Sequence, residues 1–122
     1  VLRSEAQRVE QAKVINRFVE KVLAANEEAN VVVLGDMNDF KFSRPLTTLV
    51  GDELMDTITQ LPANERYTYN YQGNSEALDH MLVSPHLRKE AKVDVVNINA
   101  DFSLADGAAR DHGARAAIFD GK

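Results

Sequence analysis

The sequence predicts an α/β fold in which a long helix leads into a buried strand. From Ser4 to about Ala29, apolar residues recur every three or four positions among Glu, Lys, Arg and Gln, the spacing of an amphipathic helix. Val31 to Leu34 then form a continuous aliphatic run, which is typical of a strand buried on both faces. A helix that feeds a central strand indicates an α/β layer. The apolar positions of the helix are Val9, Ala12, Ile15, Phe18, Val19, Val22 and Leu23.

A short helix is expected next. Pro45 suits the first turn of a helix that extends through Leu49, and Gly51 is placed to end it. Residues 54–61 are compatible with either a strand or a helix, because a short apolar run does not distinguish the two.

Alternating apolar or aromatic residues between turn-forming residues indicate a succession of short strands after residue 66. The expected elements are, in order, a strand at 67–71, a turn at 73–74, a strand at 77–83 closed by Pro85, a strand at 93–98, a loop at 99–110 and a strand at 115–119. We interpret the tyrosines at 67, 69 and 71 as sheet packing, although Tyr67 or Tyr69 at a strand end could reach a cleft.

The composition indicates one domain without cysteine chemistry. The chain has 122 residues, 44% of them hydrophobic, which suffices for one core and not for two. Because cysteine is absent, carboxylate, imidazole and amide groups are the candidate metal ligands, and these favour a hard cation. The formal charge of -5 argues against binding nucleic acid through a broad positive surface. It is compatible with a nuclease, because carboxylates can surround a divalent cation that faces the phosphate.

Three short polar segments border hydrophobic strands: Gly35 to Asn38, Leu78 to His80, and Arg110 to His112. Hydrolysis of a phosphodiester needs an oriented water, a proton acceptor, a cation and donors to the phosphoryl oxygens, and Asp, Asn and His together meet these needs. Taken singly, each segment is more simply a turn or a loop cap. Their joint occurrence in this order predicts a hydrolytic site.

The same segments carry a resemblance to a known family. Residues 31–40 resemble the Gly-Asp-x-Asn segment of the endonuclease/exonuclease/phosphatase superfamily. Residues 77–84 resemble the superfamily's Asp-containing strand, and residues 110–112 resemble its terminal Ser-Asp-His motif. The amino-acid sequence of residues 35–40, 66–69 and 71–75 is most similar to that of large bacterial extracellular nucleases of this superfamily. This similarity implies a nucleic acid substrate and a parent protein that is extracellular or at the cell surface.

The resemblance implies a role for each matched residue. Asp36 would activate or orient the attacking water, Asn38 would hold this water or a phosphate oxygen, and His112 would contact the scissile phosphate. Asp79 would pair with His112 and orient its ring. Asp111 would help to bind the divalent metal, normally Mg²⁺ or Mn²⁺, with Ca²⁺ as an alternative. Both the first Asp and the terminal His are candidates for the general base, and the sequence leaves this assignment open.

Other polar residues near the motifs receive structural interpretations. His80 and Asp39 match no general catalytic position, and strand alternation turns His80 away from the face of the preceding aspartate. His86 follows a proline in a turn and is expected to face solvent. Arg44 and Arg66 could grip a phosphate from nearby loops, although simple solvation is the favoured expectation for both.

The resemblance also implies the fold and the domain organisation. The superfamily fold is a four-layered α/β sandwich, in which two facing sheets have helices outside. Residues 1–122 would form the C-terminal portion of one such domain, a mostly antiparallel or mixed sheet with flanking helices. The N-terminal half, which carries the principal metal-binding Glu, would be absent. The terminal motif departs from the family pattern, with Arg110 in place of Ser and Gly113-Ala114 in place of an acidic residue and Pro.

We therefore expect a fragment of a divalent-metal-dependent nuclease that hydrolyses DNA or RNA by in-line attack of activated water. The alternatives are a phosphatase or sphingomyelinase-like phosphodiesterase of the same fold, and a non-catalytic interaction domain. A lone half would expose an apolar sheet face. We expect that face to bind the missing half, to form a homodimer or to repack, and the fragment alone to be weakly active or inactive.

Overall fold

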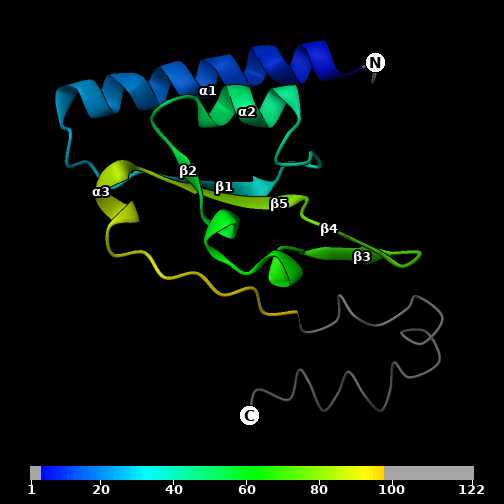
Figure 1. The fold of residues 1–122 in the computed structure, drawn as a ribbon. Helices are drawn as coiled ribbons and strands as arrows, with labels where there is room; N and C mark the ends of the chain where they lie inside the picture. The colour runs from blue at the N-terminus through cyan, green and yellow to red at the C-terminus, as the bar shows by residue number, and fades with distance from the viewer. Residues whose placement is uncertain (1–3, 98–122) are drawn as a thin grey trace, which may run out of the picture.

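Two helices lie on one side of a small antiparallel sheet, and a hairpin extends beyond the end of that sheet (Figure 1). The computed structural model describes residues 4–97. Their elements confirm the expected α/β class. In chain order they are α1 (Glu5–Ala25), β1 (Val32–Asp36), α2 (Arg44–Val50), β2 (Met55–Asp56), the 3₁₀ helices η1 (Thr57–Gln60) and η2 (Ala63–Glu65), β3 (Tyr69–Tyr71), β4 (Asn74–Glu76), β5 (Asp79–Val83) and α3 (Pro85–Arg88).

Helix α1 confirms the predicted helix but ends at Ala25, earlier than expected. The backbone of Asn26 is extended, and its Oδ1 accepts a hydrogen bond from the Glu28 amide at 3.0 Å. A local bond of this kind competes with helix propagation. The helix therefore includes every named apolar position but stops before the expected end near Ala29.

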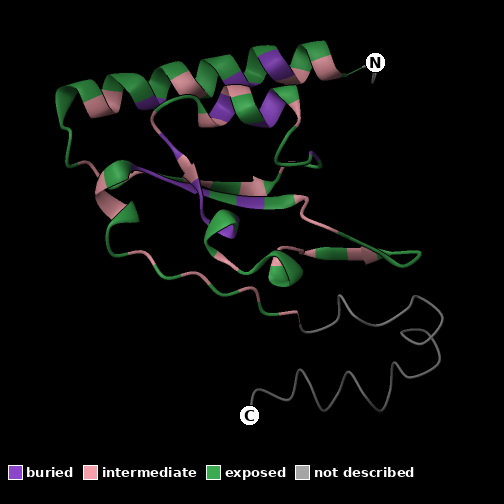
Figure 2. Cartoon of the chain, viewed as in Figure 1, coloured by how far each residue is buried: buried purple, intermediate pink, exposed green. Residues whose placement is uncertain are grey.

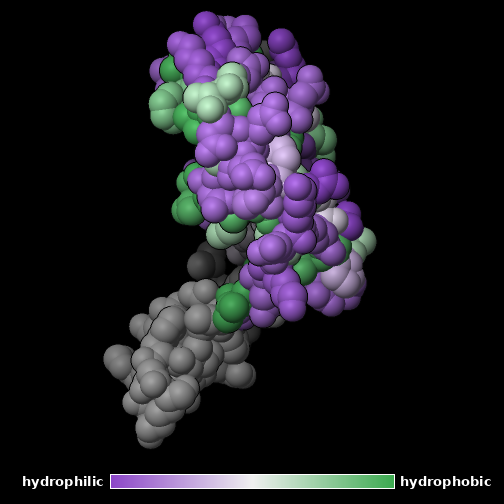
Figure 3. Space-filling view, turned by 90° about the vertical axis from the view of Figure 1, so that its left-hand side faces the viewer, coloured by the Kyte–Doolittle hydropathy of each residue, from purple (hydrophilic) through white to green (hydrophobic). Residues whose placement is uncertain are grey.

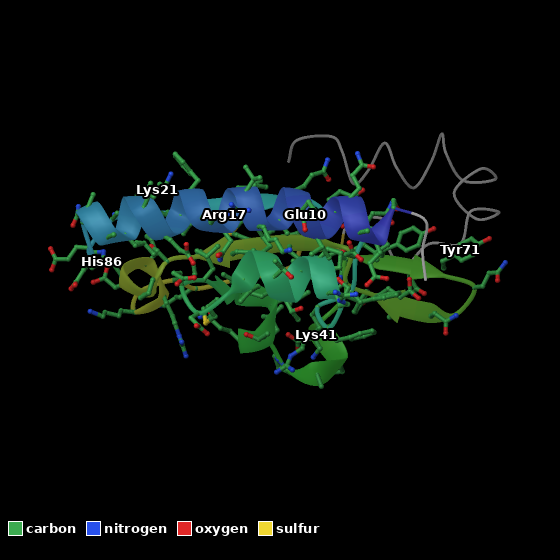
Figure 4. The ribbon with its side chains drawn as sticks, turned by 90° about the horizontal axis from the view of Figure 1, so that it is seen from above. Glu10, Arg17, Lys21, Lys41, Tyr71 and His86 are labelled. Atoms are coloured by element: carbon green, nitrogen blue, oxygen red, sulfur yellow. The ribbon has the colours of Figure 1, made fainter. Side chains whose placement is uncertain are left out.

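The apolar stripe of α1 is narrower than its sequence suggests. Val9, Ala12 and Val19 are buried, whereas Phe18 is 64% exposed and Ile15 is 41% exposed. The main partner of α1 is the seven-residue helix α2, which is too short to cover a wide stripe. Figure 4 shows the charged side chains of Glu10, Arg17 and Lys21 on the outer surface of α1.

Helix α2 confirms the expected short helix. Ser43 is its N-cap, with Oγ accepting from the Leu46 amide at 3.3 Å, and Pro45 lies in the first turn. Gly51 ends the helix with a φ of 53°, a conformation that glycine adopts without steric cost. Leu46 and Leu49 are buried and contribute to the core.

The three-stranded sheet has the order β1-β5-β2, and both pairings are antiparallel. The prediction that residues 31–34 are buried on both faces is wrong. Leu34 is 65% exposed and Val32 is 45% exposed, because the helices cover only the other face of β1. Within residues 4–97, the open face also carries the exposed side chain of Met81 on β5.

The strand predicted at 77–83 is confirmed as β5, which begins at Asp79, whereas the turn predicted at 73–74 lies one residue earlier. Strand β3 pairs with the short strand β4, and the turn between them lies at Gln72-Gly73, whose φ angles are 48° and 80°. Positive φ at both central residues suits a two-residue hairpin. Strand β5 is a separate element, because it pairs with β1 and β2 instead of β3.

The prediction that the tyrosines of β3 pack in a sheet core is wrong for Tyr69 and Tyr71. Tyr69 and Tyr71 are both exposed, and their rings stack on each other with centroids 6.1 Å apart. Figure 4 shows Tyr71 on the hairpin, at the opposite end of the protein from His86.

The remaining predictions have mixed outcomes. Residues 54–61 contain both β2 and η1, so the ambiguous stretch is part strand and part 3₁₀ helix. Residues 93–97 form no strand, which corrects the expectation for 93–98 in the part that the structure describes. The expected loop at 99–110 and the strand at 115–119 lie outside the described residues.

The buried residues gather between the helices and the sheet (Figure 2). The core cluster consists of Ala12, Val19, Leu46, Leu49, Leu54 and Leu82. By contrast, the surface at the end of the molecule that carries α3 is largely hydrophilic (Figure 3). The core therefore lies between the helices and the face of the sheet that they cover.

Truncation of the most buried leucine should test this core. Leu82 is completely buried in β5, so we expect Leu82→Ala to lower the free energy of unfolding by about 2–5 kcal/mol. Val14 is 65% exposed on α1, and Val14→Ala should change that energy by less than about 0.5 kcal/mol. Urea denaturation followed by circular dichroism measures both, and equal effects would contradict the core assignment.

Candidate functional site

Two carboxylates meet at the end of the β1–β5 pair. Asp36 and Asp79 are register partners across these strands, and both are exposed. They lie on the open face and line a cavity of about 360 Å³. Asp111 and His112, the other residues expected at this site, lie outside the described residues.

The turn after β1 orients the first carboxylate. Asp36 Oδ1 accepts a hydrogen bond from the Asn38 amide at 2.9 Å, which closes a tight turn. The Met37 amide donates to the Leu78 carbonyl at 3.0 Å and ties this turn to the start of β5. Asn38 has a φ of 50°, in the left-handed region that asparagine tolerates better than most residues. The Asp-x-Asn spacing therefore has a conformational basis.

Thr68 holds the second carboxylate. Its Oγ1 donates to Asp79 Oδ2 at 2.7 Å and accepts from the amides of Leu78 and Asp79, each at 3.2 Å. The Thr68 amide donates to the Glu76 carbonyl at 2.9 Å. Thr68 thus connects the β3–β4 hairpin to the site. Nothing in the sequence distinguishes Thr68 as a site residue, because a threonine among alternating tyrosines is an ordinary strand residue.

His80 lies on the opposite face of the sheet, as strand alternation predicts. Its side chain is buried, with Nδ1 at 2.7 Å from Asp56 Oδ2 and Nε2 at 2.9 Å from the Asp39 carbonyl oxygen. Burial by itself lowers the pKa of His80, but the hydrogen bonds to Asp56 and to the Asp39 carbonyl outweigh it and raise the pKa above its ordinary value. These contacts are consistent with a structural role.

Asp39 connects the turn to helix α1. Its carboxylate accepts from Arg8 Nε at 2.8 Å and from an Arg8 terminal nitrogen at 3.2 Å, a two-pronged contact. Asp39 is buried and Arg8 is partly buried, so solvent screens this pair less than a surface ion pair. Arg8 has the spacing of a solvated helix residue, and the sequence offers no signal that it contacts a residue 31 positions away.

The other basic candidates have different positions. Arg66 donates to the carbonyls of Leu61 at 2.6 Å and Thr59 at 2.9 Å, so it stabilises the loop after η1 instead of being simply solvated. The side chain of Arg44 is 79% exposed and lies 3.7 Å from the Glu5 carboxylate. Neither arginine lines the cavity beside Asp36 and Asp79.

The described residues do not form a metal centre by themselves. Within 4–97, no group of three or more His, Cys, Asp or Glu side chains is arranged to hold a metal ion. Carboxylate oxygens suit a hard divalent cation, but the expected ligand Asp111 is beyond this range. Helices of the described part are also too short or too polar to cross a membrane.

The fold and the site define an α/β protein with an acidic site where the end of β1 meets the start of β5. Residues 2–107 match the model of the endonuclease/exonuclease/phosphatase family, and the chain belongs to this family. Membership supports a hydrolase of the phosphodiesterase, nuclease or phosphatase type. Enzymes of the family generally use divalent metal ions, and a nucleic acid substrate fits the family.

No curated protein sequence and no solved structure matched the chain.

The raised pKa of His80 predicts how stability depends on pH. The folded protein holds this proton more tightly than the unfolded chain, so the stabilisation is complete below the unfolded value of about 6.5. It is lost as the pH rises through the folded pKa. We expect the urea midpoint to fall as the pH rises above the unfolded value and through the folded pKa. His86→Gln should keep this dependence and His80→Gln should remove it; a midpoint that rises over the range would contradict the expectation.

Proposed function

We propose that the chain is part of a divalent-metal-dependent nuclease that hydrolyses DNA or RNA by in-line attack of activated water. The observation that carries this proposal is the juxtaposition of Asp36 and Asp79 at an accessible cavity, in a member of the endonuclease/exonuclease/phosphatase family. Both carboxylates are oriented by hydrogen bonds before any substrate binds. Such preorganisation is what catalysis of phosphodiester hydrolysis requires.

In this proposal the carboxylates have different roles. Asp36 activates or orients the attacking water, and Asn38 holds that water or a phosphate oxygen. Asp79 orients His112, which contacts the scissile phosphate and is, with Asp36, one of two candidates for the general base. The contact from Thr68 supports the role of Asp79, because it fixes one carboxylate oxygen and leaves the residue at the cavity edge.

The metal belongs to the same proposal. Asp111 helps to bind Mg²⁺ or Mn²⁺, with Ca²⁺ as an alternative, and the cation when bound offsets negative charge on the phosphoryl oxygens. The formal charge of -5 is compatible with this chemistry, since the cation supplies the positive charge that faces the substrate. The motif similarity to bacterial extracellular nucleases supports an exported parent protein.

We further propose that residues 1–122 belong to the C-terminal portion of one domain, and that the N-terminal half of this domain covers the open sheet face. Support comes from the apolar residues Val32, Leu34 and Met81, which are exposed together on β1 and β5. An exposed apolar face of this kind commonly marks an interaction surface. A second copy of the chain is the alternative occupant.

Loss of either carboxylate should abolish hydrolysis. In a protein that contains this domain with its N-terminal half, we expect Asp36→Asn and Asp79→Asn each to lower kcat at least about 100-fold. A neutral amide neither accepts the proton of the attacking water nor stabilises a protonated imidazole by its charge. Asp52→Asn, at an exposed position after α2, is the matched control. The assay uses single-stranded and duplex DNA, RNA and a phosphomonoester with Mg²⁺. Retained activity in both site variants would refute the assignment, and turnover of the monoester alone would favour a phosphatase.

A charged residue on the open face should prevent association. We expect Leu34→Glu to weaken binding to the N-terminal half or to a second copy, because burial of an unpaired charge in an apolar interface is costly. Phe18→Glu, at an equally exposed position on α1, should have little effect. Sedimentation velocity measures both variants. A folded monomer of the original chain that does not bind a hydrophobic dye would count against an exposed apolar surface.

A further inference from the structure

Arg8 holds the Asp39 side chain of the segment 36–39, which we call the Asp36 turn. Three further hydrogen bonds hold the backbone of residues 37–39. Two are made by backbone amides: Met37 to the Leu78 carbonyl, and Asn38 to Asp36 Oδ1. The third connects the Asp39 carbonyl to Nε2 of His80 on β5 at 2.9 Å. It is the one contact of the three that a side chain outside the turn makes, so a substitution can remove it alone.

The partners of His80 assign the protons on its ring. A carbonyl oxygen only accepts hydrogen bonds, so Nε2, which faces the Asp39 carbonyl, carries a hydrogen. Nδ1 faces the Asp56 carboxylate at 2.7 Å and donates to it. Asp56 is itself fixed, because its Oδ1 accepts from the Ile58 amide at 3.3 Å. The contacts therefore run from η1 through Asp56 and His80 to the turn.

The surroundings make this arrangement rigid. His80 is 4% exposed, and Asp56 and Asp39 are each 6% exposed, so water does not readily replace these bonds. The charged groups that face the ring region come from three elements: Asp56 from β2, Asp39 from the turn and Arg8 from α1. Arg8 neutralises the Asp39 carboxylate, and this leaves the Asp39 carbonyl as the group that the imidazole holds.

We propose that His80 is a positioning residue: its Nε2–H holds the Asp39 carbonyl and thereby fixes the turn that presents Asp36 and Asn38, while Asp56 fixes the ring. The catalytic meaning of this inference rests on the proposed function. The contact itself can be observed without substrate. The left-handed backbone of Asn38 persists only where its surroundings hold it, so loss of this contact should loosen the turn.

Two substitutions of His80 each remove one of the two hydrogen bonds that its ring makes. The amide of glutamine reaches about as far as Nε2, so His80→Gln can still donate to the Asp39 carbonyl while it loses Asp56. The shorter amide of asparagine lies near Nδ1, so His80→Asn can keep Asp56 while it loses the carbonyl. A purely space-filling histidine would respond to both changes alike, because both remove the ring.

Amide hydrogen exchange in the 122-residue chain provides the measurement. We expect His80→Asn to raise the exchange rates of Met37 and Asn38 at least about tenfold relative to the original chain, and His80→Gln to leave them within about threefold. The Ser84 amide, which donates to the carbonyl of Val31 just before β1, is the internal control, and its exchange rate should be equal in the two variants.

Three results would overturn the proposal: equal exchange in the turn for both variants, faster exchange at Ser84 that matches the change in the turn, or imidazole nitrogen shifts that show Nε2 without its hydrogen. Assays of the domain with its N-terminal half then separate this inference from the proposed function. If His80→Asn loosens the turn and its effect on kcat is larger than its effect on KM, the positioning role and the proposed function both stand. If the turn loosens but the original protein hydrolyses no phosphodiester, the proposed function fails and the positioning role stands.

Discussion

The antiparallel pairing of β1 with β5 is the constraint on which the site depends. Its register places Asp36 opposite Asp79, although the two residues are 43 positions apart in the chain. A shift of one residue would turn one of these carboxylates toward the helices, because successive side chains on a strand face opposite sides. The buried side chain of Leu82 opposes such a shift, since it would move to the open face. Core packing and site geometry are therefore set by the same register.

The two faces of this sheet have different physical tasks. The covered face packs against α1 and α2 and supplies the core. The open face combines apolar residues in the middle of β1 and β5 with carboxylates at the strand ends, where a cavity is accessible. This separation allows charged groups to stay hydrated while the strands that carry them are stabilised from behind.

Polar contacts from distant segments complete the orientation of the site. Thr68 from the hairpin fixes Asp79, and the contacts of Arg8 and His80 with Asp39 join α1 and β5 to the Asp36 turn. Buried hydrogen bonds of this kind have a directional requirement that apolar packing lacks. The core holds the strands, and these polar groups determine how the turn between them is presented.

Local sequence patterns and short motifs were sufficient to predict the α/β class, the family, helices α1 and α2, and the strands that carry Asp36 and Asp79. These features depend on short-range periodicity, turn chemistry and capping, which are written in neighbouring residues. The pairing partner of β5, the exposure of Leu34 and the contact between Arg8 and Asp39 could not be derived in this way. Each depends on which segments meet in space and which face remains uncovered, and a linear pattern contains no direct record of either.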